Sequence, residues 1–466
     1  MSSTFSGLST ALNALMSQRA ALTVTGQNIA NANTVGYSRQ RAELSAIVSS
    51  AKTGMTSGTA IGTNGGGVTV SSIRRLADAF VDARQRDAHS TSSYATAQSG
   101  ALDTLEGILG EPSDNGLSAQ LSDFWGAWQG LANTPDSVPA RQALLSKAAA
   151  IVTTITHGRA SIDGAFTDTR SQLDALATDV NSTSQSIADL NDQIRSLTAG
   201  GNTPNELIDQ RDQLSLHLSE LVGGRSFAND DGTVSISVNG VSVVTGTHAA
   251  TLSVSGGGTI DTLASNPLQL AWSNGSTASF DSGQVAGTID ALTSTFVDAA
   301  SSYDQIANVL ATSVNAIHAT GQDLDAVPTG DFFAGTTAKT LALAVTDPRK
   351  VGAAALAADG KPSLDASVAD AMAALATSRT GPDVQWSSFV AATGVTTAQA
   401  HSNVSVRTAI SSQSDANRAS TSGVSLDEEM SNMLMFQRAY EGAGRMMTAI
   451  DEMLDTLINR TGQVGR

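Results

Sequence analysis

Apolar side chains near the C-terminal end of the chain recur at alternating steps of four and three residues. This spacing places them on one side of a helix and is typical of a helix that packs lengthwise on another helix. Ser425 and Glu428 predict a capping box at the start of this helix. Because a long isolated helix is only marginally stable in water, another helix must cover this line. The line, called the C-terminal seam below, consists of Phe436, Tyr440, Ala443, Met447, Ile450, Leu454 and Leu457, with Leu426 and Met433 extending it backwards.

The N-terminal end carries a weaker line of the same kind. Its helix should end near Ala32, where several asparagines and Gly36 favour turn conformations. Two positions, Arg19 and Gly26, are not apolar, so this N-terminal seam is less continuous than the C-terminal one. We expect the two seams to pack on each other; an ordinary surface helix folded onto its own domain is the alternative. The positions are Phe5, Leu8, Leu12, Leu15, Arg19, Leu22, Gly26 and Ile29.

Further apolar residues of the C-terminal helix lie off its seam. One weak seam cannot cover a strong one around its whole circumference. We therefore expect the additional positions to contact other subunits of an assembly. They are Met430, Leu434, Met446, Met453 and Ile458.

The middle of the chain is mostly helical in pattern. Residues 74–222 and 285–318 show helical periodicity, with Pro139 placed at a first helical position and Pro204 opening a later helix. Trp125 and Trp128 are interpreted as core anchors in preference to a ligand cage. Residues 35–73 look extended, and residues 386–422 predict one helix leading into the C-terminal one.

A change of pattern at residue 223 predicts an inserted β domain. Two alternating runs are joined by Asn239-Gly240, which is a strong hairpin signal. The predicted fold is therefore mainly α with inserted β: terminal helices paired as a coiled coil, an elongated helical body and a small β domain. The expected domains are 1–60 with 424–466, then 61–222 with 286–423, and 223–285. Residues 321–385 give no clear pattern.

Composition narrows the possible partners. The chain has 43 Asp and Glu against 26 Lys and Arg, a formal net charge of −17. This balance argues against nucleic acid and against an anionic membrane surface as partners. Cysteine is absent, so no disulfide or Cys-ligated metal can form. The apolar runs fall far short of the ~20 residues of a membrane span, and no basic segment precedes an apolar block as in a cleaved export signal.

Candidate chemistry is sparse. The six histidines occur singly, without the spacing of a zinc site. Glycines 65–67 precede a strand, the wrong order for a phosphate loop. The acidic run 427–429 is better explained by helix capping than by a metal, and Asp209 to Asp212 predict a solvated helix face. We therefore expect no enzyme activity, no catalytic or metal residues and no cofactor.

Four motifs resemble bacterial flagellar axial proteins, the family of rod, hook and hook-associated subunits. Residues 30–40 (ANANTVGYSRQ) resemble the segment that ends the first helix throughout this family. Residues 422–429 (SGVSLDEE), 139–144 (PARQAL) and 205–214 (NELIDQRDQL) are similar to segments of the first hook-associated protein, which joins hook and filament. Together they cover both ends and most of the helical body.

The resemblance implies a structural subunit of the hook–filament junction that permits filament assembly on the hook. It implies contacts with other copies of the chain, the hook subunit and a second junction protein on the filament side. It also implies an extracellular location, export without a cleaved signal peptide by the flagellar type III apparatus, and a chaperone at the C-terminal helix. Many relatives carry a second projecting β domain, for which residues 321–385 are too short. The expected subunit-contact residues are Leu8, Leu12, Leu15, Leu22, Ile29, Asn33, Gly36, Tyr37, Phe436, Tyr440, Met447, Ile450, Leu454 and Leu457.

Two other interpretations stay open at this point. Another axial subunit, of the hook or flagellin-like type, would share the terminal helices; flagellins lack the residue 33–37 motif, and hook subunits lack the long helical body. A secreted hydrolase built on a flagellar scaffold would need a catalytic set within residues 223–385. No such set is evident there.

Overall fold

The computed structural model describes residues 2–47, 66–357 and 361–456. The helices are α1 (Ser2–Ala30), α2 (Ala79–Leu109), α3 (Leu117–Asn133), α4 (Val138–Ala199), α5 (Asn205–Val222), α6 (Gly283–Asp290), α7 (Phe296–His318), α8 (Ser367–Ala374), α9 (Pro382–Ser422) and α10 (Leu426–Asp455). The strands are β1 (Gln40–Ala46), β2 (Val68–Arg75), β3 (Arg225–Ala228), β4 (Val234–Val238), β5 (Val241–Thr245), β6 (His248–Ala249), β7 (Leu252–Ser255), β8 (Gln269–Trp272), β9 (Gly321–Gln322), β10 (Phe333–Ala334), β11 (Ala342–Leu343) and β12 (Ala354–Ala355). The prediction of a mainly helical fold with inserted β structure is confirmed.

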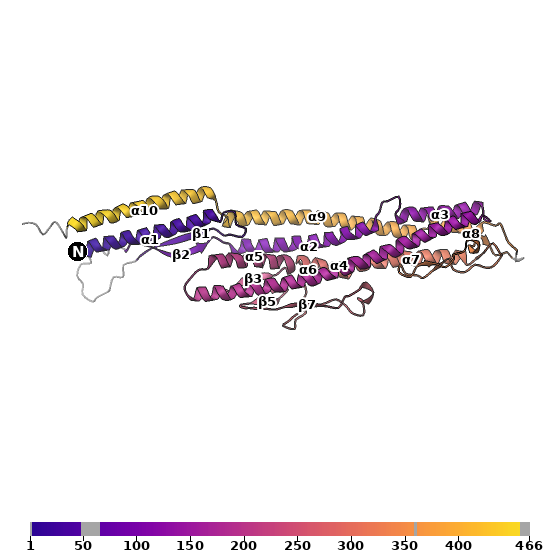
Figure 1. Ribbon diagram of the computed structural model, residues 1–466, viewed down its shortest axis with the longest axis horizontal. Helices are drawn as coiled ribbons and strands as arrows, with labels where there is room; N and C mark the ends of the chain where they lie inside the picture. Colours follow the sequence, from indigo (N-terminus) through magenta and orange to yellow (C-terminus); the bar gives the residue numbers. More distant parts are fainter. Residues whose placement is uncertain (1, 48–65, 358–360, 457–466) are drawn as a thin grey trace, which may run out of the picture.

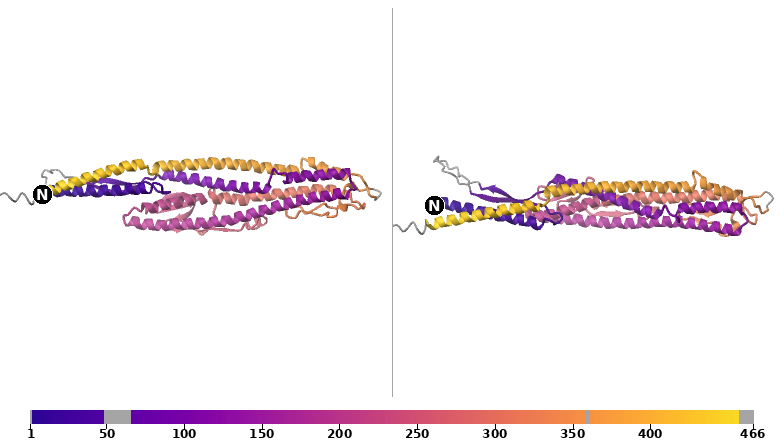
Figure 2. Two further views of the ribbon diagram at one scale, coloured as in Figure 1. Left: turned by 45° about the horizontal axis from the view of Figure 1, so that its top comes forward. Right: turned by 90° about the horizontal axis from the view of Figure 1, so that it is seen from above.

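The molecule is a long rod (Figure 1). Helices α1 and α10 lie side by side at one end, and the β1–β2 hairpin lies beside α1. The body consists of long helices, in which α2 runs along α9 and α4 runs beside α5 and α7. Both further views show the terminal pair extending beyond the body (Figure 2).

The longest helix of the body is α4, with 62 residues. At about 1.5 Å per residue it spans roughly 90 Å. Ser137 caps its start by accepting a hydrogen bond from the Ala140 amide, and Pro139 occupies the second helical position. The sequence pattern indicated separate helical stretches around this region, but the helix continues through Gly158. A Cβ atom at Gly158 would lie 2.4 Å from the Tyr303 ring, so α7 packs directly on the α4 backbone there.

The inserted strands β3 to β8 lie along α4, on the side of the body opposite α9 (Figure 1). Strands β3, β4, β5 and β6 form an antiparallel sheet, and β7 pairs with β8. Asn239 and Gly240 both have positive φ angles, 45° and 82°, as a tight hairpin turn requires. The predicted hairpin is confirmed.

The end of the rod far from the termini has an aromatic core. The rings of Phe124 and Trp128 pack against those of Phe332 and Phe333, with centroid separations between 5.6 and 6.1 Å for three of these pairs. Trp125 is buried and its indole nitrogen donates to Asp383 at 2.8 Å. The prediction that Trp125 and Trp128 are core anchors is confirmed. Residues 321–357 and 361–385, which gave no clear pattern, include short strand pairs and α8 near this core.

The β1–β2 hairpin belongs spatially to the terminal helices. Its antiparallel register pairs Gln40 with Arg75 and Ala46 with Val68. The Ser17 hydroxyl on α1 donates to the Val68 carbonyl at 3.0 Å. The predicted boundary at residue 60 lies outside the described residues.

Candidate assembly site

The C-terminal seam faces α1 along much of α10. Ala443 and Ile450 are buried, and a Cβ atom at Gly7 of α1 would lie 3.3 Å from Ile450 Cδ1. Phe436, Met447 and Leu454 on the same seam are half-buried. Leu426 and Tyr440 are exposed instead. Leu457 lies outside the described residues.

Helix α1 faces α10 with a different line of residues from the one that the sequence suggested. Gly7 and Asn28, which contact Ile450 and Glu429, lie on the line Gly7, Ala11, Ala14, Gln18, Ala21, Thr25 and Asn28, of which Ala11, Ala21, Thr25 and Asn28 are buried. Each member precedes a predicted seam residue by one position, which is a rotation of about 100° around the helix axis.

Small side chains explain this rotation. They let the two helix backbones approach closely, and large α10 side chains fill the space. Leu8, Leu15, Leu22 and Ile29 are consequently half-buried at the edge of the pair, and Leu12 is 43% exposed. The α1 residues that contact α10, Gly7 and Asn28, are therefore offset by one position from the predicted leucine line. The side chain of Phe5 is not described.

Large apolar side chains project from the terminal pair into solvent. Met16 on α1 is 60% exposed, and the α10 residues Met430, Leu434, Met446 and Met453 are 45–59% exposed. Ile458 lies outside the described residues. The four described positions that lie off the C-terminal seam are thus uncovered in the single chain.

Three residues of the loop after α1 were predicted as subunit contacts, and they lie in different environments. Asn33 is exposed. Gly36 has a φ angle of 84° and packs against the Gln213 side chain, so a larger residue would be strained there. Tyr37 points inward, and its hydroxyl donates to Asn28 Oδ1 at 2.9 Å. Burial, followed by the nearby carboxylates of Asp209, Glu206 and Glu429, raises the pKa of Tyr37 to about 12.

Three of the motifs in the sequence meet where the terminal pair joins the body. We call this cluster the basal node: Asn28, Tyr37, Arg39, Gln40, Asn205, Asp209 and Glu429. The Gln40 side chain accepts from Asn205 Nδ2 at 3.0 Å and donates to Glu206 Oε1 at 3.3 Å. The Ser38 amide donates to Asp209 Oδ2 at 3.2 Å. The segment after α1 is therefore bonded directly to the first turns of α5.

Arg39 links this segment to α10. Its Nε donates to Glu429 Oε1 at 2.7 Å, and its Nη1 donates to Glu428 Oε2 at 2.6 Å. Its backbone amide donates to the carbonyl of Ser422, the last residue of α9. The predicted capping box was wrong: Ser425 is the N-cap residue but makes no side-chain cap hydrogen bond, and Glu428 pairs with Arg39.

Asp209 and Arg211 were assigned to a solvated helix face, and this was wrong. Both are buried, at 7% and 5% exposure. Asp209 lies 2.8 Å from Arg75 Nε of strand β2, and Arg211 donates to Asn191 and to the Gly232 carbonyl. The sequence signal that could have indicated this is the pairing of Asp209 and Asp212 on one helix face, where both reach Arg75.

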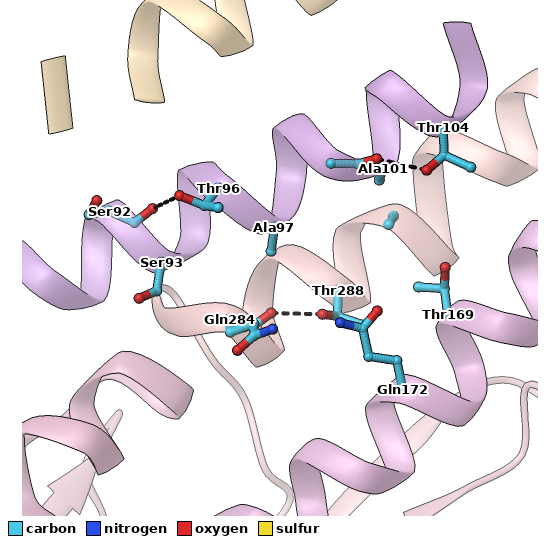
Figure 3. A pocket seen from close by; sticks show the side chains of 12 residues that line it. Ser92, Ser93, Thr96, Ala97, Ala101, Thr104, Thr169, Gln172, Gln284 and Thr288 are labelled. Atoms are coloured by element: carbon cyan, nitrogen blue, oxygen red, sulfur yellow. Dashed lines mark hydrogen bonds between the residues drawn. The ribbon is translucent and has the colours of Figure 1, made fainter. Parts of the chain in front are cut away.

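A polar hollow of about 480 Å³ lies between α2, α4 and α6 (Figure 3). Its lining consists of small, hydroxyl and amide side chains. Three of these hydroxyls, on Thr96, Thr104 and Thr288, donate to carbonyls of their own helices. The lining contains no charged side chain and no histidine.

Two further properties concern the described residues as a whole. No group of three or more His, Asp or Glu side chains among them is arranged to hold a metal ion. No helix in this part of the chain is long and apolar enough to span a bilayer.

Comparison with known proteins decides the family. Over 525 aligned residues, covering 100% of both chains, the sequence is 32% identical to "Flagellar hook-associated protein 1" of Bacillus subtilis (strain 168). The chain belongs to the flagellar hook-associated protein 1 family. The Escherichia coli (strain K12) member is 33% identical over 53% of this chain and 44% of its own length. The Salmonella typhimurium member is 29% identical over 69% of this chain and 58% of its own length.

Family models and a solved structure agree with this membership. Residues 102–333 match the flagellar hook-associated protein FlgK helical domain, residues 416–460 the flagellar basal body rod FlgEFG protein C-terminal model, and residues 8–37 the flagella basal body rod protein model. The flagellar hook junction protein FlgK from Burkholderia pseudomallei has the same fold, with a TM-score of 0.65 at 15% identity, covering 74% of this chain and 100% of that one.

Membership in this family makes the chain a structural subunit of the bacterial flagellum and not an enzyme. It decides in favour of a hook-associated protein over a hook or flagellin-like subunit. Self-assembly and association with the hook follow at the level of the family.

Proposed function

We propose that the chain forms the junction between hook and filament and lets the filament assemble on the hook. The observation that supports this most directly is the terminal helix pair, which extends beyond the body and carries uncovered apolar side chains on both helices. Burial of each such side chain is worth roughly 1.5–3 kcal/mol, so a few of them suffice to hold subunits together. Family membership supplies the flagellar context.

The same proposal assigns partners to the two ends of the junction. One end contacts the hook subunit, the other contacts a second junction protein on the filament side, and neighbouring copies contact each other laterally. The expected terminal domain, residues 1–60 with 424–466, would supply most of these contacts. The half-buried leucine line of α1 and the exposed methionines of α10 are the surfaces available for them.

Export belongs to the proposal as well. The subunit would leave the cell through the flagellar type III apparatus without a cleaved signal peptide, with a chaperone holding α10. The uncovered apolar positions on α10 support a need for such protection, because an exposed apolar helix promotes aggregation.

The test is complementation of cells that lack the chain. These cells should have hooks without filaments and release flagellin into the medium, and the wild-type gene should restore filaments. A variant with Met446→Glu and Met453→Glu should leave the hooks bare, while the purified variant melts like the wild type because both side chains are exposed. The control is Leu197→Glu, an exposed apolar residue on α4. Normal filaments in the deletion strain would contradict the proposed function.

A further inference from the structure

The contact line between α1 and α10 contains a buried polar pair at one end. Glu429 precedes Met433 and Phe436 by steps of four and three, so it occupies a regular position of the C-terminal seam. It is 2% exposed. Asn28 occupies the corresponding last position of the α1 line and is 1% exposed. Their side chains meet directly, with Asn28 Nδ2 donating to Glu429 Oε2 at 3.1 Å.

The Asn28 amide is held rigidly. Its nitrogen donates to the Gln40 carbonyl at 2.8 Å as well as to Glu429. Its oxygen accepts from the Gln40 amide and from the Tyr37 hydroxyl, both at 2.9 Å. All four hydrogen-bonding positions of the amide are therefore used. On the other side, Arg39 neutralises the Glu429 carboxylate at 2.7 Å.

The remaining contacts specify the alignment of the two helices weakly. A Cβ atom at Gly7 would contact Ile450. In an antiparallel helix pair, the numbers of two facing residues have a constant sum. This sum is 457 both for Gly7 with Ile450 and for Asn28 with Glu429, so one register accounts for both contacts. Between them the α1 line has a small side chain at every position except Gln18. A slide by seven residues would again place large α10 side chains on small α1 side chains.

The polar pair distinguishes the two registers. After a slide by seven residues toward the N-terminus of α1, Glu429 would face Ala21 and leave both Asn28 and Arg39. A buried carboxylate without a partner is strongly unfavourable, whereas a buried polar contact at one seam position is a known way of fixing helix register. We propose that Asn28, Glu429 and Arg39 fix the register of the terminal helix pair and thereby determine which side chains the pair presents to other subunits. The second half of this statement rests on the proposed function; the first half does not.

Disulfide trapping in the full chain tests the register directly, because the protein has no cysteine of its own. The pair Ala14→Cys with Ala443→Cys matches the observed register, since these numbers also add up to 457. The pair Gly7→Cys with Ala443→Cys matches the register in which Glu429 faces Ala21, since the numbers of both pairs add up to 450. In the wild-type background the first pair should form a disulfide under mild oxidation and the second should stay reduced.

Glu429→Leu replaces the carboxylate by an apolar side chain that suits the seam. We expect helix content and melting temperature to be retained, while the displaced pair becomes oxidised to an extent comparable with the first. Glu429→Gln keeps an oxygen that can accept from Asn28 and should restore the wild-type pattern. If Glu429→Leu gives the wild-type pattern, the short connection between α9 and α10 sets the register and the proposal is wrong.

Filament assembly in cells separates this inference from the proposed function. Glu429→Leu should leave hooks without filaments, and Glu429→Gln should support them. A displaced register together with normal filaments would contradict the claim that the register determines the assembly surface. The same claim would be contradicted if both variants left the hooks bare although Glu429→Gln kept the wild-type register.

Discussion

Replacing His89 should destabilise the helical body at neutral pH and remove a pH dependence of its stability. His89 on α2 lies between two carboxylates from different helices. Its Nδ1 is 2.7 Å from Glu220 Oε1 on α5, and its Nε2 is 2.8 Å from Asp415 Oδ1 on α9. Because both partners are acceptors, both ring nitrogens must carry protons, and the imidazolium holds the three helices together.

The magnitude follows from the pKa of the ring. Hydrogen bonding to Glu220, reinforced by Asp415 and opposed by burial, raises the pKa of His89 from 6.5 to about 9. Each unit corresponds to about 1.4 kcal/mol, so the limit is about 3 kcal/mol. Partial exposure of Asp415 and Glu220 reduces the expected value to about 2 kcal/mol. Since the folded pKa is the higher one, this stabilisation is complete below the unfolded pKa and is lost as the pH rises through the folded pKa.

Urea unfolding followed by far-ultraviolet circular dichroism measures the effect. His89→Gln should lower the unfolding free energy by about 2 kcal/mol near pH 6.5 and by little near pH 9.5. The wild type should lose stability between these pH values and the variant should not. His157→Gln on α4 is the control, because this histidine makes no ion pair within the described residues. Parallel pH profiles of the wild type and His89→Gln would refute the reasoning.

Two further predictions concern packing inside the body. Gly287→Ala should destabilise the body by about 1–3 kcal/mol, because the new Cβ would lie 2.8 Å from the Tyr94 carbonyl oxygen on α2. Gly164→Ala, which has open space around its new Cβ, should stabilise the body by roughly 0.5–1 kcal/mol. Thermal unfolding should therefore shift in opposite directions for the two variants, and shifts in the same direction would contradict the packing argument. Asn191→Leu should lower the unfolding free energy by about 1–3 kcal/mol and speed amide hydrogen exchange in β4, because Asn191 Nδ2 donates to the Val234 and Gly246 carbonyls at 2.8 and 2.7 Å. Unchanged exchange would show that β4 does not depend on this contact.

The elements that local chemistry determines were predictable from the sequence. Asn239-Gly240 predicted the hairpin because few other residue types adopt two consecutive positive φ angles. The seam on α10 was predictable because large apolar side chains recur on one face. Trp125 and Trp128 were predictable as core residues because Leu121, Phe124, Trp128 and Leu131 recur at helical spacing on one face, with Trp125 beside them.

The predictions that failed concerned features that depend on tertiary contacts. Periodicity identifies the face with the largest side chains, but α1 contacts α10 through alanines, so the predicted line is rotated by one residue. Asp209 and Glu429 are charged side chains in helical segments, and such side chains are usually exposed. Each is buried because an arginine distant in sequence, Arg75 or Arg39, lies beside it. A single sequence shows residue propensities and spacing, but it does not show which distant residues pair in the fold.

The architecture explains why the polar contacts concentrate at the basal node. Small side chains along α1 bury little apolar area, so the α1–α10 contact gains less from the hydrophobic effect than a core of leucines would. A connection of three residues, 423–425, joins α10 to α9, and a connection of this kind does not by itself fix the direction of a helix. Charge-assisted hydrogen bonds from Arg39 to Glu428 and Glu429, which are directional, supply the missing constraint. Apolar side chains can then remain uncovered on the outside of the pair without leaving its geometry undetermined.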